Sequence, residues 1–209
     1  YDIIHIHGPT PLLSDMALLV NDIPVLYTHH AEVSWLSENL SYSYRRFHRF
    51  LACKKARVII VHSCDYARLF KGTRVEVVRP PVTFQSLKSF QPHMRLKRPF
   101  TLIYVGQFRA FKGIEVLIKT ASILKDVHFI LVGEGPLKRK FLSLVRRLNL
   151  KNVVFEEGVD DRKLQALYGN SHIVCLPSIN TTEAYGLVLI EASLHGCVPS
   201  ASDLIGVRE

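Results

Sequence analysis

The sequence has no long apolar run. No stretch of its 209 residues approaches the about 18 consecutive apolar residues that a transmembrane helix requires. The first residues, YDIIHIHG, have the pattern of a strand and lack the basic and then apolar regions of a signal peptide. We therefore expect neither a membrane span nor a secretion signal, and we predict a cytoplasmic protein.

Cysteine is scarce and its spacing does not fit a metal site. The four cysteines, Cys53, Cys64, Cys175 and Cys197, form no C-x-x-C pair and lie in or beside apolar runs. This spacing disfavours a zinc site or a disulfide framework. It predicts buried free thiols in a reducing compartment.

Acidic residues are outnumbered by basic ones. The chain has 27 Lys and Arg against 18 Asp and Glu, a formal net charge of +9, which favours anionic partners. No signature of a DNA- or RNA-binding module is present, so nucleic acid is not expected. The cations gather in two helical regions, 43–57 and 136–150, and the first interleaves them with Phe47 and Phe50. Ordinary amphipathic helices with solvated basic faces explain this pattern, and peripheral contact with the inner membrane face is the alternative.

Predicted strands and helices alternate along the whole chain. Strands are expected at 2–7, 24–28, 57–62, 75–79, 101–105, 127–132, 153–155, 172–177 and within 195–202, with helical patterns between most of them. A helix is expected to open at Thr10 and Pro11, and another, CDYARLFK, to be capped by Ser63. This alternation predicts an α/β protein with parallel sheets and helices on both faces.

The alternation is interrupted once, by a polar, Pro-containing stretch at 80–99 that has no clear period. We therefore predict two Rossmann-like lobes, residues 1–85 and 100–209, joined by a linker at 86–99. Two such lobes imply a cleft between them.

Two Gly-rich loops follow predicted strands, where ligands bind in open parallel sheets. GEGPLK has Lys138 in place of the third glycine of a dinucleotide fingerprint, which argues against an NAD-dependent oxidoreductase. GQFRAFKG has no Ser or Thr after its Lys-Gly pair, so it is not a Walker A loop. At strand ends, small residues such as these let a ligand approach the backbone.

Two carboxylates flank a predicted loop-to-helix junction. Glu183 lies in the loop after the strand HIVCLP, and Glu191 lies in a helix that begins near Gly186. The N–H groups at such a helix start suit a phosphate or diphosphate, and carboxylates accept hydrogen bonds from sugar or ribose hydroxyls. The alternative is that one Glu caps the helix and the other is solvated.

Histidines occur at the ends of the first two predicted strands. His5 and His7 share one face of a strand by the two-residue period, as structural imidazoles or as ligands. His29 and His30 follow the second strand, at the edge where ligands bind.

The segment PSINTTEAYGLVLIEASLHG resembles the signature region of retaining glycosyltransferases of family 4, the glycosyl transferases group 1, whose shared motif is Glu, seven residues, Glu. The resemblance implies that Glu183 contacts the transferred sugar and that Glu191 holds the ribose, beside the helix start at Gly186 and Leu187. It also implies a His near the reacting sugar in a P-x-x-x-T-x-H frame. Counting from Pro24 through Thr28 gives His30, with His29 as second choice.

The family clamps the donor diphosphate with an Arg and a Lys in a loop that corresponds to GQFRAFKG. The loop begins at Gly106 and contains the expected Lys as Lys112. Gln107 occupies the position, directly after Gly106, where the family has the Arg. A Gln donates a neutral hydrogen bond in place of a charged fork. Arg109 is either its substitute or a surface residue.

The resemblance implies a GT-B fold and metal-independent sugar transfer, with retention, from a nucleotide-diphosphate-sugar to a glycan or lipid-linked acceptor. No cofactor is expected, because the nucleotide-sugar is a substrate, and no Asp-x-Asp is present to hold a metal. Compared with the family, the N-terminal lobe is incomplete and the C-terminal lobe stops early, so the sequence resembles an internal piece. The alternative, favoured by Gln107, is a non-catalytic subunit that binds a sugar nucleotide or a glycan.

Overall fold

The computed structural model describes residues 2–19, 23–33, 37–81 and 99–209. The chain divides into two compact units, each described by itself. Unit 1 comprises residues 1–81, 180–185 and 203–209, and unit 2 comprises residues 82–179 and 186–202. The predicted linker at 86–99 lies outside the described residues except for Pro99.

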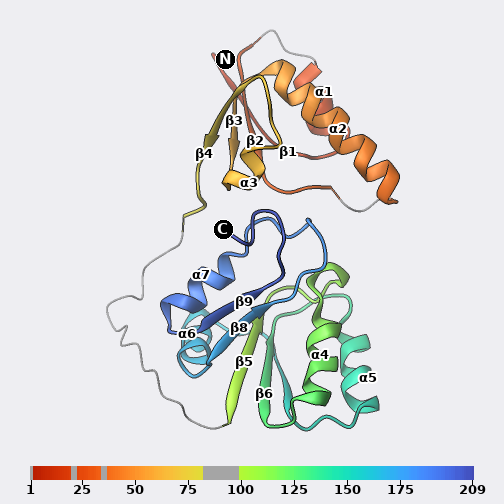
Figure 1. The fold of residues 1–209 in the computed structure, drawn as a ribbon, viewed down its shortest axis with the longest axis vertical. Coiled ribbons are helices and arrows are strands. Elements are labelled where there is room, and N and C mark those ends of the chain that lie inside the picture. Colours follow the sequence, from red (N-terminus) through yellow and green to blue (C-terminus); the bar gives the residue numbers. More distant parts are fainter. Residues whose placement is uncertain (1, 20–22, 34–36, 82–98) are drawn as a thin grey trace. The chain divides into compact units, whose positions relative to one another are not determined.

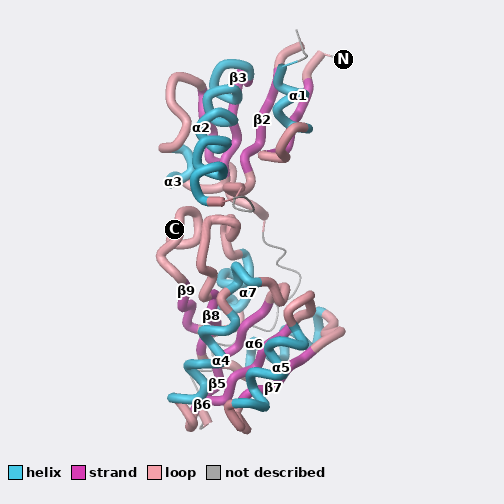
Figure 2. Tube along the Cα trace, turned by 90° about the vertical axis from the view of Figure 1, so that its right-hand side faces the viewer, coloured by secondary structure: helices cyan, strands magenta, loops and turns pink. Residues whose placement is uncertain are grey.

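Unit 1 is built on a four-stranded parallel sheet. Its elements are β1 (Ile4–Gly8), α1 (Leu13–Leu19), β2 (Val25–His29), α2 (Glu38–Lys55), β3 (Ala56–Val61), α3 (Cys64–Ala67) and β4 (Arg74–Val77). The strands lie in the order β1-β2-β3-β4, so each strand pairs with its neighbour in sequence. The core is fully buried at Leu18, Tyr27, Ile59 and Tyr66. Figure 1 and Figure 2 show α1 and α2 side by side along this sheet.

Unit 2 has a five-stranded parallel sheet. Its elements are β5 (Phe100–Val105), the 3-10 turn η2 (Ala110–Lys112), α4 (Ile114–Ile123), β6 (Val127–Val132), α5 (Lys138–Arg147), β7 (Val153–Glu156), α6 (Asp161–Gly169), β8 (Ile173–Leu176), α7 (Leu187–Leu194) and β9 (Val198–Ala201). Helices α4 and α5 cover one face of the sheet, and α6 and α7 cover the other (Figure 1). The two sheets confirm the predicted α/β class.

The strand order in unit 2 positions the candidate site. The sheet runs β7-β6-β5-β8-β9, so the chain builds outward from β5 on one side and then continues with β8 on the other. The order therefore reverses between β5 and β8. In open parallel sheets, ligands bind at the carboxyl ends of the strands at such a switch point.

Two predicted helix starts in unit 1 have different outcomes. Ser63 caps α3 as expected, because its hydroxyl accepts a hydrogen bond from the backbone N–H of Tyr66 at 3.2 Å. The helix ends at Ala67, earlier than predicted, because the next residues close tighter turns with bonds from Leu69 and Phe70 to carbonyls three residues back. The predicted start at Thr10 and Pro11 is wrong: Leu12 has a φ of 69°, which keeps the chain out of the helix before Leu13.

The prediction of buried thiols is correct only in part. All four cysteines are free, and Cys197 is buried, which raises the pKa of its thiol to about 11. Cys53 and Cys175 are half-buried, and Cys64 is exposed because it is the first residue of the short helix α3. In the described part of the chain, no helix is both long enough and apolar enough to cross a membrane.

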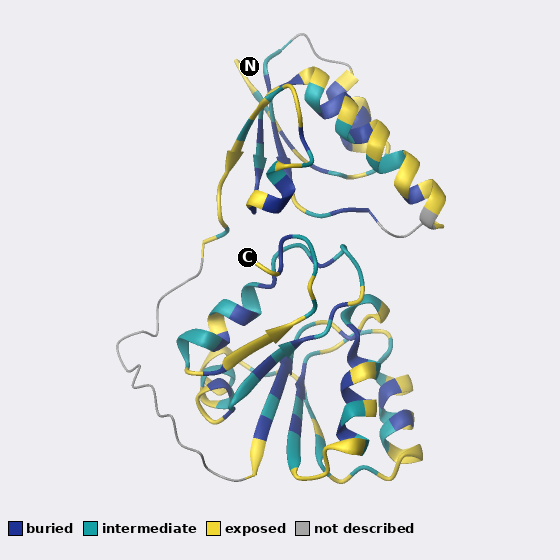
Figure 3. Cartoon of the chain, in the orientation of Figure 1, coloured by how far each residue is buried: buried dark blue, intermediate teal, exposed yellow. Residues whose placement is uncertain are grey.

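Helix α2 has exposed apolar side chains, whereas the sequence pattern predicts an exposed face of basic residues. Leu51 is buried, whereas Leu40, Phe47 and Phe50 are 60%, 53% and 62% exposed. Figure 3 shows exposed and buried residues alternating along α2. The Lys54 ammonium lies 5.8 Å from the ring centroid of Phe50. The outer face of α2 is therefore mixed apolar and cationic.

Candidate active site

The loop after β5 contains four of the residues predicted to bind a donor. Gly106 and Lys112 are half-buried, and Gln107 and Arg109 are exposed. The loop is fixed at its start, because the hydroxyl of Tyr104 donates to the Gln107 carbonyl at 3.0 Å. Lys112 ends the turn η2, directly before α4.

Gln107 and Arg109 contact each other through their side chains. The Arg109 Nε–H donates to the Gln107 Oε1 at 2.7 Å. This bond occupies the Nε–H and fixes the orientation of the Arg109 guanidinium. The other four N–H donors, on Nη1 and Nη2, take no part in this bond. The residue that replaces the expected Arg therefore holds a nearby Arg in the same loop.

The glycines of GEGP serve backbone packing. A Cβ atom at Gly133 would meet the carbonyl of Gly106, and one at Gly135 would meet the backbone of Phe108. The Phe108 N–H also donates to the Glu134 carbonyl at 2.7 Å. At these two glycines the position of a Cβ atom is occupied by the neighbouring loop, so the absence of a side chain lets the two loops pack together.

The loops after β5 and β8 are joined at the switch point. The Ile179 N–H donates to the Phe111 carbonyl at 2.8 Å. Gly113, with a φ of 68°, packs directly against the carbonyl of Pro177. These two contacts attach the turn that contains Lys112 to residues 177–179, the segment that precedes Glu183.

Helix α7 begins as the sequence predicts. Gly186 is its N-cap with a φ of 76°, and Leu187 is its first residue. Glu191 is exposed one turn later, and its carboxylate adds to the effect of burial in raising the pKa of Tyr168 on α6. Glu191 is therefore held beside a buried phenol, on the same short helix as the Gly186 cap.

Glu183 is buried, with 7% of its surface exposed, and belongs to unit 1, whereas Gly186, Leu187 and Glu191 belong to unit 2. Its backbone N–H donates to the Asn180 carbonyl at 3.3 Å, which closes a tight turn three residues before the N-cap of α7. Within the described residues, no group of three or more His, Cys, Asp and Glu side chains is placed to hold a metal ion.

The two candidate histidines after β2 differ in accessibility. His29 is 1% exposed and packs edge-on against Tyr66 and Phe70, with ring centroids 5.2 and 5.1 Å away. Burial, and secondarily His48 and Arg49, lower the pKa of His29 to about 3, so it is neutral at ordinary pH. His30 is exposed at the carboxyl edge of the sheet. Of the two, only His30 is exposed to solvent.

The structure adds two histidines that the sequence reasoning did not assign to the site. The Nε2 of His30 lies 2.8 Å from the Nδ1 of His7, and its Nδ1 lies 3.1 Å from the Nε2 of His62. His5 and His7 do share a face of β1, with ring centroids 4.2 Å apart. A signal was present, because His7, His30 and His62 each stand at a predicted strand end.

Two family models together cover the chain. The model described as Glycosyltransferase Family 4 matches residues 1–85, and the model described as Glycosyl transferases group 1 matches residues 86–209. The D-rhamnosyltransferase WbpZ of Pseudomonas aeruginosa is 33% identical over 52% of this chain and 28% of its own length. The O-antigen chain mannosyltransferase C of Escherichia coli is 25% identical over 92% of this chain and 54% of its own length.

Solved structures of GT-B glycosyltransferases share the fold. The sucrose-phosphate synthase of Thermosynechococcus elongatus matches 99% of this chain and 57% of its own, with a TM-score of 0.76 and 23% identity. HepE of Anabaena, solved in complex with UDP-glucose, matches 99% of this chain and 61% of its own, with a TM-score of 0.70 and 19% identity. The chain thus spans 28% to 61% of the length of these proteins. It has the GT-B type of α/β fold and belongs to the family 4, group 1 glycosyltransferases.

Proposed function

We propose that the intact protein transfers a sugar from a nucleotide-diphosphate-sugar to a hydroxyl of a glycan or lipid-linked acceptor, with retention of configuration and without a metal. The observation that carries the proposal is the loop after β5, where Gln107 holds Arg109 by a 2.7 Å hydrogen bond and Arg109 directly precedes the turn that ends at Lys112. Arg109 and Lys112 supply two cations for one diphosphate.

The proposed roles follow from the chemistry of each group. Arg109 and Lys112, with the backbone N–H groups of Gly186 and Leu187 at the start of α7, offset the charge that develops on the leaving diphosphate. Gly106 lets the chain leave β5 beside the ligand, and Gln107 orients Arg109. Glu191 accepts from the ribose hydroxyls and Glu183 from the transferred sugar, and His30 is assigned to the neighbourhood of the transferred sugar.

The comparisons support the substrate class. HepE was solved with UDP-glucose, and relatives in Escherichia coli and Mycobacterium leprae are named as mannosyltransferases of an O-antigen chain and of phosphatidyl-myo-inositol. The first is a nucleotide-diphosphate-sugar, and the others name a glycan and a lipid as acceptors. No separate cofactor takes part, because the donor is itself a substrate.

Thermal unfolding with UDP, GDP and ADP and their sugar conjugates tests the donor site. A nucleotide at 100 times its dissociation constant is expected to stabilise the protein by ~2.7 kcal/mol, a rise in Tm of about 5 to 10 °C for a chain of this size. The rise is expected to shrink in Glu191→Ala and to persist in Asp126→Ala, an exposed carboxylate beside the amino end of β6. No rise with any nucleotide contradicts the proposal, and a rise without turnover of the conjugates favours the non-catalytic subunit.

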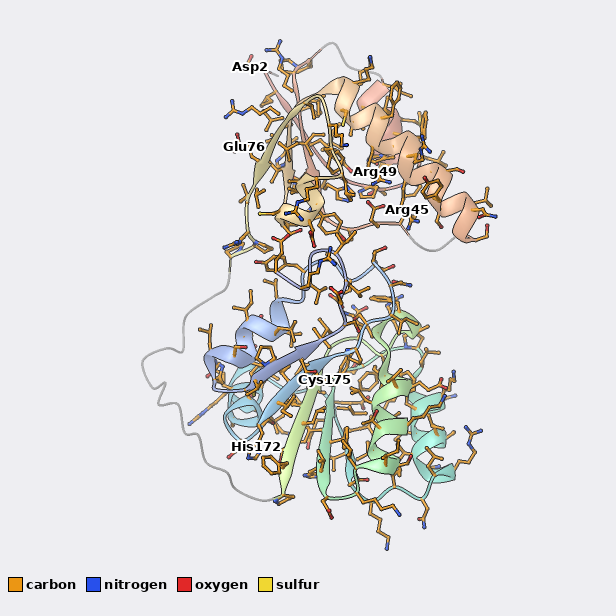
Figure 4. The ribbon with its side chains drawn as sticks, in the orientation of Figure 1. Asp2, Arg45, Arg49, Glu76, His172 and Cys175 are labelled. Carbon is orange, nitrogen blue, oxygen red and sulfur yellow. The ribbon has the colours of Figure 1, made fainter. Side chains whose placement is uncertain are left out.

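Peripheral contact of a cytoplasmic protein with an anionic membrane is part of the proposal. The support is the outer face of α2, where exposed Leu40, Phe47 and Phe50 lie among Arg46, Lys54 and Lys55. Two other cations of α2 are engaged elsewhere: Arg45 and Arg49 lie 3.5 and 4.0 Å from the buried Glu32 (Figure 4). The outward cations complement anionic headgroups, and the aromatic rings suit the interface.

Co-sedimentation with phosphatidylglycerol vesicles tests this contact. Phe47→Ser with Phe50→Ser is expected to lower the bound fraction at least fivefold, because two interfacial anchors are lost. Ile123→Ser, which removes a 78% exposed apolar side chain from α4 of unit 2, is the matched control and should bind normally. Equal binding to uncharged phosphatidylcholine vesicles, or no loss in the double variant, contradicts the contact.

A further inference from the structure

Three imidazoles and one carbonyl form a continuous hydrogen-bonded row along the carboxyl edge of the unit 1 sheet. Each member comes from the end of a different strand, in strand order: His7 from β1, His30 after β2, His62 after β3 and the Val78 carbonyl after β4. The successive distances are 2.8 Å, 3.1 Å and 2.9 Å. We call this row the histidine chain.

The carbonyl at one end fixes the direction of every bond in the chain. A carbonyl only accepts, so the Nδ1 of His62 carries a proton and donates to Val78. In the neutral ring the Nε2 of His62 is then an acceptor, and it receives the Nδ1–H of His30. By the same argument the Nε2 of His30 receives the Nδ1–H of His7.

This direction leaves one open acceptor. Both ring nitrogens of His30 are used within the chain, so neither is available to a ligand. The Nε2 of His7 is unprotonated, and His7 is exposed with no partner for that atom among the described residues. The neighbouring His5 is itself held by the hydroxyl of Thr28 at 2.7 Å. The chain therefore presents an outward lone pair at His7.

We propose that His7 is the ligand-contacting residue of this edge, that its Nε2 accepts a hydrogen bond from a sugar hydroxyl, and that His30 and His62 are positioning residues that hold it in the accepting tautomer. The inference rests on the proposed function and deepens it, because it adds a contact between His7 and a sugar of the acceptor, beside the contact with the transferred sugar that was expected of His30. A neutral imidazole nitrogen that only accepts selects a hydroxyl donor over a phosphate or carboxylate, which only accept.

The surroundings favour the neutral form of His30, the central ring of the chain. Burial, then His62, His7 and His5 in that order, lower the pKa of His30. Burial and His7 also lower the pKa of His5, which packs against His7 from the same strand. A hydrogen bond between two imidazole nitrogens needs a proton on one nitrogen and a lone pair on the other, and neutral rings supply both.

Histidine-ring ¹⁵N spectra of the full chain at about pH 8.5, well above the ordinary histidine pKa of about 6.5, test the direction. We expect His7, His30 and His62 all to carry their proton on Nδ1. Signals are assigned with single His→Gln variants. A proton on the Nε2 of His7 overturns the inference, and this result does not depend on any activity or on a nucleotide.

A matched pair of substitutions at His62 tests its positioning role. In His62→Gln the amide can donate to the Val78 carbonyl and its oxygen can accept from His30, so the tautomer of His7 should persist. In His62→Leu both contacts are lost, and His30 and His7 are expected to populate both tautomers. An unchanged His7 spectrum in His62→Leu overturns the positioning role.

The hydroxyl contact is tested with methyl α-D-mannopyranoside, and with its fully O-methylated derivative as a probe without hydroxyl donors. We expect the first to shift the Nε2 signal of His7 and the second to leave it unchanged. In a transfer assay, His7→Phe is expected to raise the KM for the acceptor about tenfold, the worth of about 1.4 kcal/mol, and to leave the KM for the donor unchanged. Absence of the His7 shift while nucleotides still raise Tm overturns this inference alone, whereas absence of any nucleotide effect counts against the donor site of unit 2.

Discussion

Replacing Lys112 with alanine is expected to lower kcat for sugar transfer by about 10²- to 10³-fold, the usual loss when one group that stabilises developing charge is removed. The side chain is half-buried at the end of η2, in the loop where Gln107 holds Arg109. Negative charge grows on the diphosphate as the bond to the sugar breaks, so a fixed cation stabilises the transition state more than the bound donor. The KM for the donor should therefore change less than kcat.

Lys119→Ala is the matched control. Lys119 lies on α4, shortly after Lys112 in sequence, is 64% exposed, and forms an exposed ion pair with Glu115 at 3.0 Å. Exposed pairs of this kind contribute little to stability, so kcat and KM should stay within about twofold of the unmodified protein. A small effect at Lys112, or an equal loss in both variants, would show that Lys112 does not act on the leaving group.

Gly113→Ala is expected to cost about 2 to 5 kcal/mol of folding free energy, combining a left-handed backbone for alanine with overpacking. Gly113 has a φ of 68°, and a Cβ atom there would lie 1.9 Å from the Pro177 carbonyl oxygen. The loops after β5 and β8 would have to separate. We expect a Tm lower by about 5 to 15 °C in a thermal unfolding experiment, with weaker nucleotide binding because the Lys112 turn moves.

Gly158→Ala separates the two contributions. Gly158 also has a positive φ, 56°, but a Cβ atom there would meet nothing within 4 Å. Its substitution should therefore cost only the backbone term of about 1 to 2 kcal/mol. Equal losses at Gly113 and Gly158 would mean that the contact between the two loops adds nothing to stability.

The architecture follows from patterns that are local in sequence. Alternating strands and helices predict parallel sheets, and the buried face of α4, with Ile114, Leu117, Ile118 and Ala121, follows from the helical period. The same period predicts Leu124 on this face, but Leu124 follows the last residue of α4 and is 45% exposed. Element ends depend on a few backbone bonds, and a single residue such as Leu12 with a positive φ moves them.

The candidate site was predictable only where it lies within one segment. The Gly186 cap of α7 and the loop from Gly106 to Lys112 are short stretches with a readable pattern. The bond between Gln107 and Arg109 depends on side-chain geometry, so the sequence left open whether Arg109 takes part. The contacts of His30 with His7 and His62 join residues 23 and 32 positions apart, and only the strand order brings them together.

The histidine chain also connects the two outer strands of the unit 1 sheet. β1 and β4 are separated by three strand spacings, about 14 Å, yet the proton position on His7 depends on a carbonyl that follows β4. If β4 detaches from the sheet, the carbonyl is withdrawn and the outward nitrogen of His7 is no longer held as an acceptor. By thermodynamic reciprocity, a ligand bound at His7 would slow amide hydrogen exchange in β4. Amide exchange in β4, which the ligand does not contact, would thus report whether a ligand is bound at His7 on β1.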